Sequence, residues 1–161
     1  WAVLRRQRAV AGAGPRRHAE PGPDQARGGA GRGAGPEGVG AILALVHDLG
    51  TYEREPDAVE ATEADFRAVL FPEEGAPIAC AHVAVVDDEI VGMAIWYVTF
   101  STWLGHGGIW IEELFVSPQH RGYGLGKALL EALAGVCEES GYGRVEWWDL
   151  RWTKAASGFY D

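Results

Sequence analysis

The chain has 161 residues, of which 47% are hydrophobic and 23% are charged, a composition typical of a single globular domain with a buried core. Its net charge of −9 argues against a nucleic-acid-binding protein, and no stretch approaches the roughly 20 consecutive apolar residues of a membrane-spanning helix. Two cysteines, Cys80 and Cys137, are too few for a disulfide framework, which predicts reduced, buried thiols and a cytoplasmic protein.

The first 38 residues differ in composition from the rest. They hold seven arginines and three acidic residues, a net charge of +4, whereas residues 39–161 carry a net charge of −13. Arginine, glycine, alanine and proline dominate the segment, and so few large apolar side chains predict disorder. Glycine and proline also argue against an amphipathic targeting helix. We interpret residues 1–38 as a disordered, non-native leader and residues 39–161 as the folded domain.

Two helices are predicted after this leader. The first ends near Tyr52, and its apolar face consists of Ile42, Leu45, Val46 and Leu49. The second begins after Thr62, which has the side chain of an N-cap. Asp65 lies in its first turn, and Pro72 ends it.

Strands dominate the remainder of the chain. Residues 78–86 and 90–100 are rich in β-branched and aromatic residues, and the acidic turn between them predicts a hairpin. The remaining predicted elements are a strand at residues 109–116, a helix at 123–140, a strand at 145–150 and a short helix at 154–160. This order predicts an α/β fold with helices on both faces of a sheet.

The most informative stretch is the strand–loop–helix unit at residues 109–130. Pro118 ends the strand, and the glycine-rich residues 121–126 (RGYGLG) precede the helix. The first turn of a helix presents unpaired backbone N–H groups, and glycines without Cβ atoms let an anion approach them closely. The unit therefore predicts a site for a phosphate or a pyrophosphate.

The spacing of the glycines distinguishes between kinds of phosphate-binding loop. A Walker loop requires serine or threonine after its lysine, but Lys127 is followed by Ala128. A dinucleotide-binding fingerprint requires Gly-x-Gly-x-x-Gly, which these alternating glycines do not match. The pattern that fits is Arg-x-x-Gly-x-Gly, beginning at Arg121. It resembles the pyrophosphate loop of the GNAT superfamily, the acetyl-CoA-dependent N-acetyltransferases.

Within that superfamily the chain is most similar to the diamine (spermidine/spermine) acetyltransferase group, over residues 41–160. The resemblance is carried by Leu49, Tyr52-Glu53, Val91-Gly92, Ala94, Phe100-Ser101, Trp103-Leu104-Gly105, residues 112–116, the glycine loop, Trp152 and Phe159-Tyr160. It implies a mixed, mostly antiparallel central sheet with helices on both faces, acetyl-CoA as co-substrate without a metal, and a possible homodimer. It also implies a strand before the first helix and a strand pair after the last one, and the sequence shows neither.

The resemblance assigns catalytic roles to two residues. Glu112 matches the base that accepts a proton from the attacking amine, and Tyr160 matches the acid that protonates the departing sulfur. Regular alternation would place Glu112 on one face of its strand with Leu114 and Val116. Structural interpretations remain open, because Glu112 could form a salt bridge at an exposed strand end and Tyr160 could pack in the core.

Contacts to the cofactor are expected from three segments. Backbone N–H groups around residues 114–116 match the donors to the thioester oxygen, provided that the next strand diverges and leaves them unpaired. Near the end of the chain, Thr153 replaces the family's asparagine, which changes the available hydrogen bonds. The expected cofactor-binding residues are Leu114, Phe115, Val116, Arg121, Gly122, Tyr123, Gly124, Leu125, Gly126, Lys127 and Thr153.

The resemblance implies a small cationic amine as substrate, with Tyr52, Glu53 and Trp103 facing it. A carboxylate beside aromatic faces suits an ammonium group, although ordinary packing would also explain these residues. The sequence thus predicts direct acetyl transfer from acetyl-CoA to a primary amine of a polyamine-like substrate. The alternatives are a non-catalytic acyl-CoA-binding module, an enzyme for another amine such as an amino acid or a protein N-terminus, and a phosphate-loop nucleotide enzyme.

Overall fold

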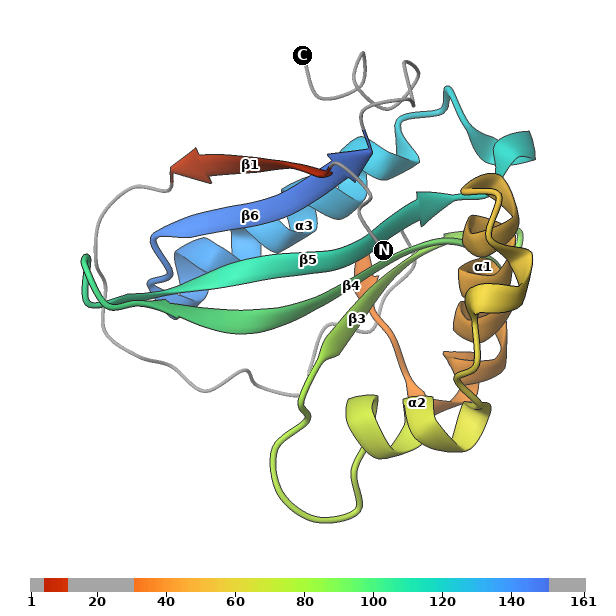
Figure 1. Cartoon of the computed structure of the whole chain (residues 1–161), viewed down its shortest axis with the longest axis horizontal. Coiled ribbons are helices and arrows are strands. Elements are labelled where there is room, and N and C mark those ends of the chain that lie inside the picture. The colour runs from red at the N-terminus through yellow and green to blue at the C-terminus, as the bar shows by residue number, and fades with distance from the viewer. Residues whose placement is uncertain (1–4, 12–30, 151–161) are drawn as a thin grey trace.

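The computed structural model describes residues 5–11 and 31–150 (Figure 1). Its centre is a six-stranded sheet in the order β1-β6-β5-β4-β3-β2. The strands are β1 (Arg5–Ala11), β2 (Arg32–Gly33), β3 (Cys80–Val86), β4 (Glu89–Ser101), β5 (His106–Val116) and β6 (Arg144–Leu150). Neighbouring strands are antiparallel except β5 and β6, which are parallel. The predicted mixed, mostly antiparallel sheet is therefore confirmed.

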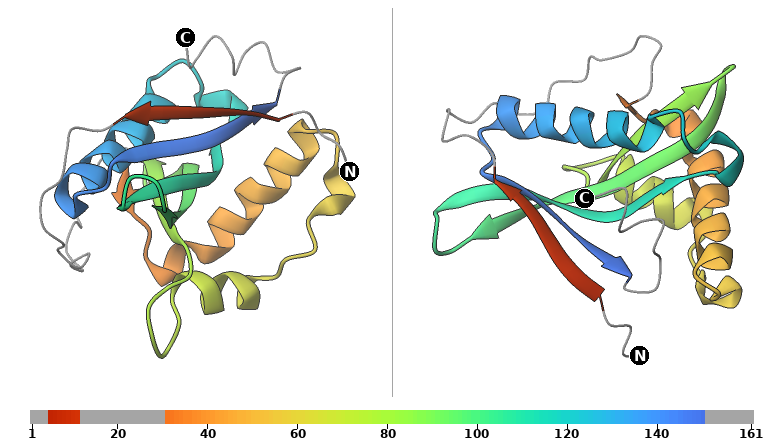
Figure 2. Two further views of the ribbon diagram at one scale, coloured as in Figure 1. Left: turned by 60° about the vertical axis from the view of Figure 1, so that its left-hand side comes forward. Right: turned by 90° about the horizontal axis from the view of Figure 1, so that it is seen from above.

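Three α-helices cover the two faces of this sheet, as predicted (Figure 2). They are α1 (Val39–Tyr52), α2 (Glu63–Leu70) and α3 (Leu125–Ser140), and short 3-10 turns occupy Pro36–Gly38, Pro56–Ala58 and Pro118–His120. On one face, Leu129 and Leu133 of α3 pack against Ile109 and Ile111 of β5. On the other face, α1 and α2 enclose a second core around Met93 of β4. Each helix buries its apolar stripe and leaves its polar side outward.

The start of α2 follows from two polar side chains. Thr62 Oγ1 accepts a hydrogen bond from the backbone N–H of Asp65 at 3.3 Å, and an Asp65 carboxylate oxygen accepts one from the backbone N–H of Thr62 at 2.8 Å. This reciprocal capping box satisfies donors that the first helical turn leaves unpaired. The bonds from Thr62, first its hydroxyl and then its amide, lower the pKa of Asp65. The predicted N-cap is confirmed.

Two segments of residues 1–38 form strands, so the prediction of disorder is wrong for them. Strand β1 pairs with β6 along seven residues, and the short β2 pairs with β3 just before α1. Backbone hydrogen bonds explain the difference, because an open sheet edge binds the main chain of another strand whatever its side chains are. A composition poor in apolar residues therefore did not exclude pairing here.

A histidine on β3 makes the fold sensitive to pH. The indole N–H of Trp96 donates to His82 Nδ1 at 3.0 Å across the β3–β4 pair. Burial lowers the pKa of His82 from its ordinary value of 6.5, because the charged ring loses hydration. The folded state therefore holds a neutral imidazole as the acceptor of this bond.

We expect the free energy of unfolding to fall as the pH drops through 6.5 toward 5. The unfolded chain takes up a proton on His82 near pH 6.5, whereas the folded chain resists protonation until a lower pH. A His82→Gln variant keeps an acceptor for Trp96 but does not titrate. Urea unfolding at pH 7 and pH 5 should therefore show a smaller loss of stability in the variant. Equal losses in both proteins would contradict this role.

Candidate functional site

Strands β5 and β6 diverge halfway along their length. They pair over three residues only, from Ile109 opposite Val145 to Ile111 opposite Trp147. Beyond that point β5 continues to Val116 alongside β4, while β6 runs on beside β1 (Figure 1). In the described part of the chain, no strand pairs with residues 112–116 on the side away from β4. The divergence on which the predicted cofactor contacts depend is therefore present.

The last residues of β5 line this opening. Leu114, Phe115 and Val116 lie opposite Ala94, Met93 and Gly92 of β4. In an antiparallel pair, alternate residues direct their N–H and C=O groups to opposite sides, so part of this backbone faces away from β4. The side chain of Phe115 is buried against α1, and those of Leu114 and Val116 pack toward α3. Packing on both faces holds this segment rigidly.

A β-bulge interrupts β5 at Glu112. Ile95 lies opposite Glu113 and Trp96 lies opposite Ile111, so Glu112 is the extra residue between them. The side chain of Glu112 is exposed, and its Oε2 accepts a hydrogen bond from the indole N–H of Trp110 at 3.1 Å.

Because of the bulge, the side chains of this strand do not alternate between the two faces as predicted. Glu112 reaches Trp110, which lies opposite Tyr97, and Tyr97 packs with the α1 core. Leu114 and Val116 pack on the α3 side instead. Glu112 therefore does not share a face with them, because one inserted residue shifts the two-residue period of the strand.

Tyr97 responds electrostatically to this carboxylate. Its pKa is raised, first by burial and second by the negative charge of Glu112. The phenol therefore stays protonated at neutral pH and adds no negative charge beside Glu112. Tyr97 and Trp110 had no place in the sequence-based site. Residues 110 and 112 are two apart on one strand, which was the available signal that their side chains are neighbours. Tyr97 could not be found in this way, because its place beside them depends on the pairing register of β4 and β5.

The glycine-rich loop joins β5 to α3. Gly122 and Gly124 have positive φ angles of 84° and 78°, and a Cβ atom built on either would meet no other heavy atom within 4 Å. Gly124 is the N-cap of α3 and brings no side chain to the first turn of the helix. Backbone N–H groups in the first turn of such a helix attract an anion. The pyrophosphate site predicted from the sequence would lie at this helix N-terminus.

The side chains around this loop differ in their surroundings. Tyr123 is exposed, and Leu125 and Gly126 are partly buried. Lys127 is exposed and lies 3.6 Å from Glu131, one helical turn further on. An ion pair so open to water contributes little to stability and leaves the ammonium group available to a phosphate.

Arg121 turns its side chain back onto the fold. Its Nε donates to the carbonyl oxygen of Val116 at 2.9 Å, and its guanidinium lies 4.6 Å from the centre of the Tyr52 ring. The guanidinium also lies 5.4 Å from the Phe115 ring, and the two rings are 6.4 Å apart. Arg121 therefore fixes the loop to β5 and α1. Because its side chain is engaged in these contacts, the predicted contact of Arg121 with the cofactor would come from its backbone.

The three expected substrate residues do not lie together. Tyr52 ends α1 beside Arg121, and Glu53 follows it as the C-cap residue. Trp103 lies in the turn between β4 and β5 and is 96% exposed. At the rise of a β-strand, six residues from His106 to Glu112 span about 20 Å, so Trp103 is remote from Glu112 within one chain. The other two predicted residues, Thr153 and Tyr160, lie outside the described residues.

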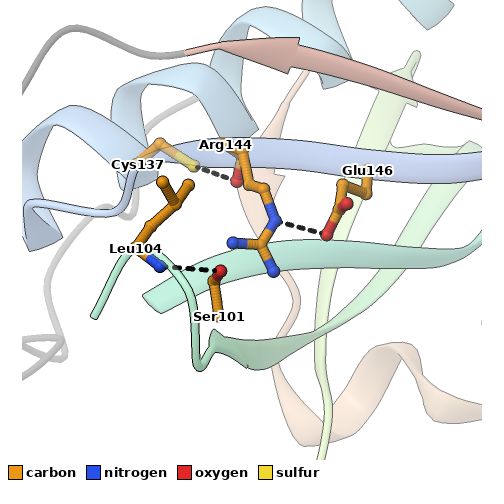
Figure 3. A network of polar contacts seen from close by, with 5 residues as sticks. All are labelled: Ser101, Leu104, Cys137, Arg144 and Glu146. Atoms are coloured by element: carbon orange, nitrogen blue, oxygen red, sulfur yellow. Dashed lines mark hydrogen bonds and ion pairs between the residues drawn. The ribbon is translucent and has the colours of Figure 1, made fainter. Parts of the chain in front are cut away.

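Both cysteines have environments that suppress their reactivity. Burial raises the pKa of Cys80, and burial raises the pKa of Cys137 to about 11. The Cys137 thiol donates to the carbonyl oxygen of Arg144 at 3.5 Å, and the Arg144 guanidinium pairs with Glu146 (Figure 3). A thiol held in this protonated state is a poor nucleophile.

Neither a cluster of metal-ligating side chains nor a membrane-spanning helix occurs in the described part of the chain. Among these residues, no three His, Cys, Asp or Glu side chains are grouped so that they could hold a metal ion. Nor is any helix in those ranges both long enough and apolar enough to cross a membrane.

Curated proteins similar in sequence are amine acetyltransferases. A thialysine N-epsilon-acetyltransferase of Bos taurus is 32% identical over 127 residues, which are 75% of this chain and 74% of the relative. That of Caenorhabditis elegans is 29% identical over 126 residues, 78% of this chain and 76% of the relative. An Arabidopsis thaliana L-ornithine N5-acetyltransferase is 33% identical over 75 residues, 47% of this chain and 33% of the relative.

Solved structures share the fold. The chain superposes on an aminoglycoside acetyltransferase from an uncultured soil metagenomic sample with a TM-score of 0.68, covering 80% of this chain and 82% of that one at 17% identity. A ribosomal-protein-alanine N-acetyltransferase of Brucella melitensis gives a TM-score of 0.62 at 21% identity, covering 80% and 84%. The acetyltransferase (GNAT) family matches residues 42–161. The strand divergence, the glycine loop and these matches agree, and the chain belongs to the acetyltransferase (GNAT) family, a family of acyltransferases.

Proposed function

We propose that the protein transfers an acetyl group from acetyl-CoA directly to a primary amine of a small cationic substrate such as a diamine or polyamine. The observation that carries this proposal is the opening between β5 and β6, which has a glycine-rich helix N-terminus at one end and Glu112 on its wall. The names of the similar proteins, which act on thialysine and ornithine, agree with an amine acceptor. They also favour a second candidate substrate, the side-chain amine of a basic amino acid.

Binding of acetyl-CoA rests on backbone groups. In this proposal the first turn of α3 and the loop around Gly122 and Gly124 hold the pyrophosphate, with Lys127 beside it. The N–H groups of residues 114–116 hold the acetyl oxygen as it becomes negative. The cofactor supplies the acetyl group as a thioester. Thr153 would add one hydroxyl contact near the end of the chain.

Proton transfer falls to Glu112 and Tyr160. An alkylammonium has a pKa near 10.4, so only about one in a thousand amines is nucleophilic at pH 7. Glu112 accepts this proton, directly or through a water, and the free amine attacks the acetyl carbon while the C–S bond breaks. Tyr160 then gives its phenolic proton to the departing sulfur. Because Cys80 and Cys137 are held as thiols, neither is suited to carry the acetyl group, which supports direct attack.

Recognition of the amine rests on charge and aromatic faces. Residues 39–161 carry a net charge of −13, which attracts cations. Tyr52 and Glu53 lie at the end of α1, on the same side of the sheet as Phe115. We propose that they contact the ammonium group of the substrate. A cytoplasmic location, consistent with the two unpaired cysteines, also remains a proposal.

Acetyl-CoA should raise the melting temperature of both the wild type and a Glu112→Gln variant, because the loop does not involve this side chain. Thiol release with a panel of diamines, polyamines and basic amino acids should occur in the wild type. It should fall about 10²- to 10⁴-fold in the variant, most of all at low pH, where free amine is scarcest. Thermal scans and a colorimetric thiol assay measure both.

The outcomes separate the rival functions. Stabilisation by acetyl-CoA without thiol release from any amine would support a non-catalytic binding module. Stabilisation by ATP or NAD instead would support a nucleotide enzyme. An unchanged rate in the Glu112→Gln variant would exclude Glu112 as the base.

A Gly124→Ala substitution should weaken acetyl-CoA binding several-fold. Its Cβ would enter open space in front of the helix N-terminus, where the pyrophosphate is proposed to lie, and the φ of 78° adds about 1 kcal/mol of strain. Gly75→Ala is the matched control, since Gly75 has a φ of 83°, equally open surroundings and a place between α2 and β3. The melting temperatures of both variants should fall by similar amounts. Equal acetyl-CoA titration curves for the two would argue against this loop as the binding site.

We also propose that two copies of the chain associate through the β4–β5 hairpin. Pairing between β3 and β4 ends at Cys80 opposite Trp96, so in the described structure the last part of β4 is an open edge. Large apolar side chains with exposures of 52% to 96% cluster there: Val98, Phe100, Trp103 and Leu104. No charged residue occurs from residue 90 to residue 111, so two molecules of net charge −9 could approach at this surface. An antiparallel edge is also complementary to itself under two-fold symmetry.

The hairpin association predicts a concentration-dependent dimer. Phe100→Lys should shift the protein toward monomer, because it places a charge on the proposed contact. Ala68→Lys, on the exposed side of α2, is the control and should behave as the wild type. Sedimentation velocity over a hundredfold range of concentration measures this. A wild type that stays monomeric throughout would contradict the proposal.

A further inference from the structure

Glu112 lies outside the regular pairing of β5. It is the inserted residue of the bulge, and its side chain is exposed. An exposed glutamate without a hydrogen-bond partner samples many rotamers, and fixing it in one orientation costs side-chain entropy. A base needs the opposite, because proton transfer requires a carboxylate oxygen within hydrogen-bond reach of the amine. Some neighbouring group must therefore hold Glu112 in place if it acts as a base.

The indole of Trp110 is the group that holds it. Its Nε1 lies 3.1 Å from Glu112 Oε2, and an indole N–H can only donate. A bond from a neutral donor to a carboxylate is charge-assisted and stronger than one between neutral groups. It engages one of the two oxygens, so Oε1 is left to meet an amine.

Neighbouring strands place Trp110 itself. It lies opposite Tyr97 on β4 and opposite Glu146 on β6, within the short stretch where β5 pairs on both sides. The pairing of β5 with β6 ends one residue later, at Ile111 opposite Trp147. Trp110 is therefore anchored in regular sheet, while the carboxylate that it holds stands at the edge of the opening.

The other charged and titratable groups nearby do not replace this contact. Tyr97 on β4 feels the charge of Glu112, and Glu113 follows it on β5. On β6, the guanidinium of Arg144 is engaged by Glu146 within that strand. The indole N–H of Trp110 donates its hydrogen bond to the Glu112 carboxylate directly.

We propose that Trp110 is a positioning residue: its indole N–H fixes Glu112 Oε2 so that Oε1 is presented to the incoming amine. This inference rests on the proposed role of Glu112 as the base. It adds to that role the means by which an exposed, bulged carboxylate keeps one orientation.

Two substitutions isolate the indole N–H. Trp110→Phe keeps an aromatic ring opposite Tyr97 and removes the donor, whereas Trp110→Tyr keeps a ring with a hydroxyl that can donate. The two variants differ by one hydroxyl group. We expect Trp110→Phe to lower kcat/KM for the amine about tenfold, as a lost hydrogen bond to a charged group does. Trp110→Tyr should recover part of this loss, and both variants should keep the stabilisation by acetyl-CoA.

A second measurement needs no turnover. The chain has seven tryptophans, so an ¹H–¹⁵N spectrum shows a small set of indole N–H signals, and the signal lost in Trp110→Phe identifies Trp110. In Glu112→Gln the acceptor loses its charge, and this one indole signal should move toward the position of a weaker hydrogen bond. The same signal in a Glu113→Gln variant should move less, because the contact ends on Glu112.

Each outcome decides between the two roles. Wild-type kinetics in Trp110→Phe, or equal losses in the Phe and Tyr variants, would overturn the proposal and leave Trp110 as a packing residue. An indole signal unaffected by Glu112→Gln would also overturn it. If instead Glu112→Gln itself retains full activity while the indole signal moves, the contact is real and the assignment of the base is the part that fails.

Discussion

The incomplete pairing of β5 with β6 is the constraint on which the site depends. Two parallel strands that share only three residue pairs leave main-chain groups of β5 without a neighbouring strand in the described structure. Buried main-chain donors are almost always satisfied, so such a segment calls for an extended ligand with acceptors along its length. Pantetheine is such a chain, with amide groups that can hydrogen-bond as a strand does. The divergence is therefore the place where we propose that the extended part of the cofactor lies beside β5.

Two other features lie close to this part of β5. The glycine loop follows β5 and leads into α3, so the positive end of the helix dipole lies near the end of the strand. The bulge sets Glu112 apart from the regular rows of side chains, because an inserted residue escapes the packing of both faces. The candidate base and all of the proposed cofactor contacts except Thr153 thus lie in one continuous stretch, residues 112–127.

The sequence predicted what depends on local signals. The capping box of Thr62 and Asp65, the helix starting at the glycine loop and the hairpin of β3 and β4 all follow from neighbouring residues, and all are present. The pairing register could not be predicted from the sequence, because it depends on two strands at once. For that reason the bulge at Glu112 and the contact from Trp110 emerged only from the structure.

Composition and motif do not fix where a segment lies in the fold. An arginine-rich segment predicted disorder at residues 5–11, yet a vacant sheet edge binds backbone regardless of side chains. Trp103 matched a substrate position by its motif, yet the hairpin turn carries it away from Glu112 in its own chain. The roles given to Thr153 and Tyr160 rest on sequence alone, since both lie outside the described residues.

Arg121 joins two parts of the protein that would otherwise work separately. Its guanidinium rests on the ring of Tyr52 at the end of α1, and its Nε holds the carbonyl of Val116 at the end of β5. A molecule that pushes Tyr52 aside therefore also loosens the support of the glycine loop. In the proposed reaction, an amine bound at Tyr52 would therefore also affect the loop proposed to hold the pyrophosphate, because one guanidinium group contacts both sides.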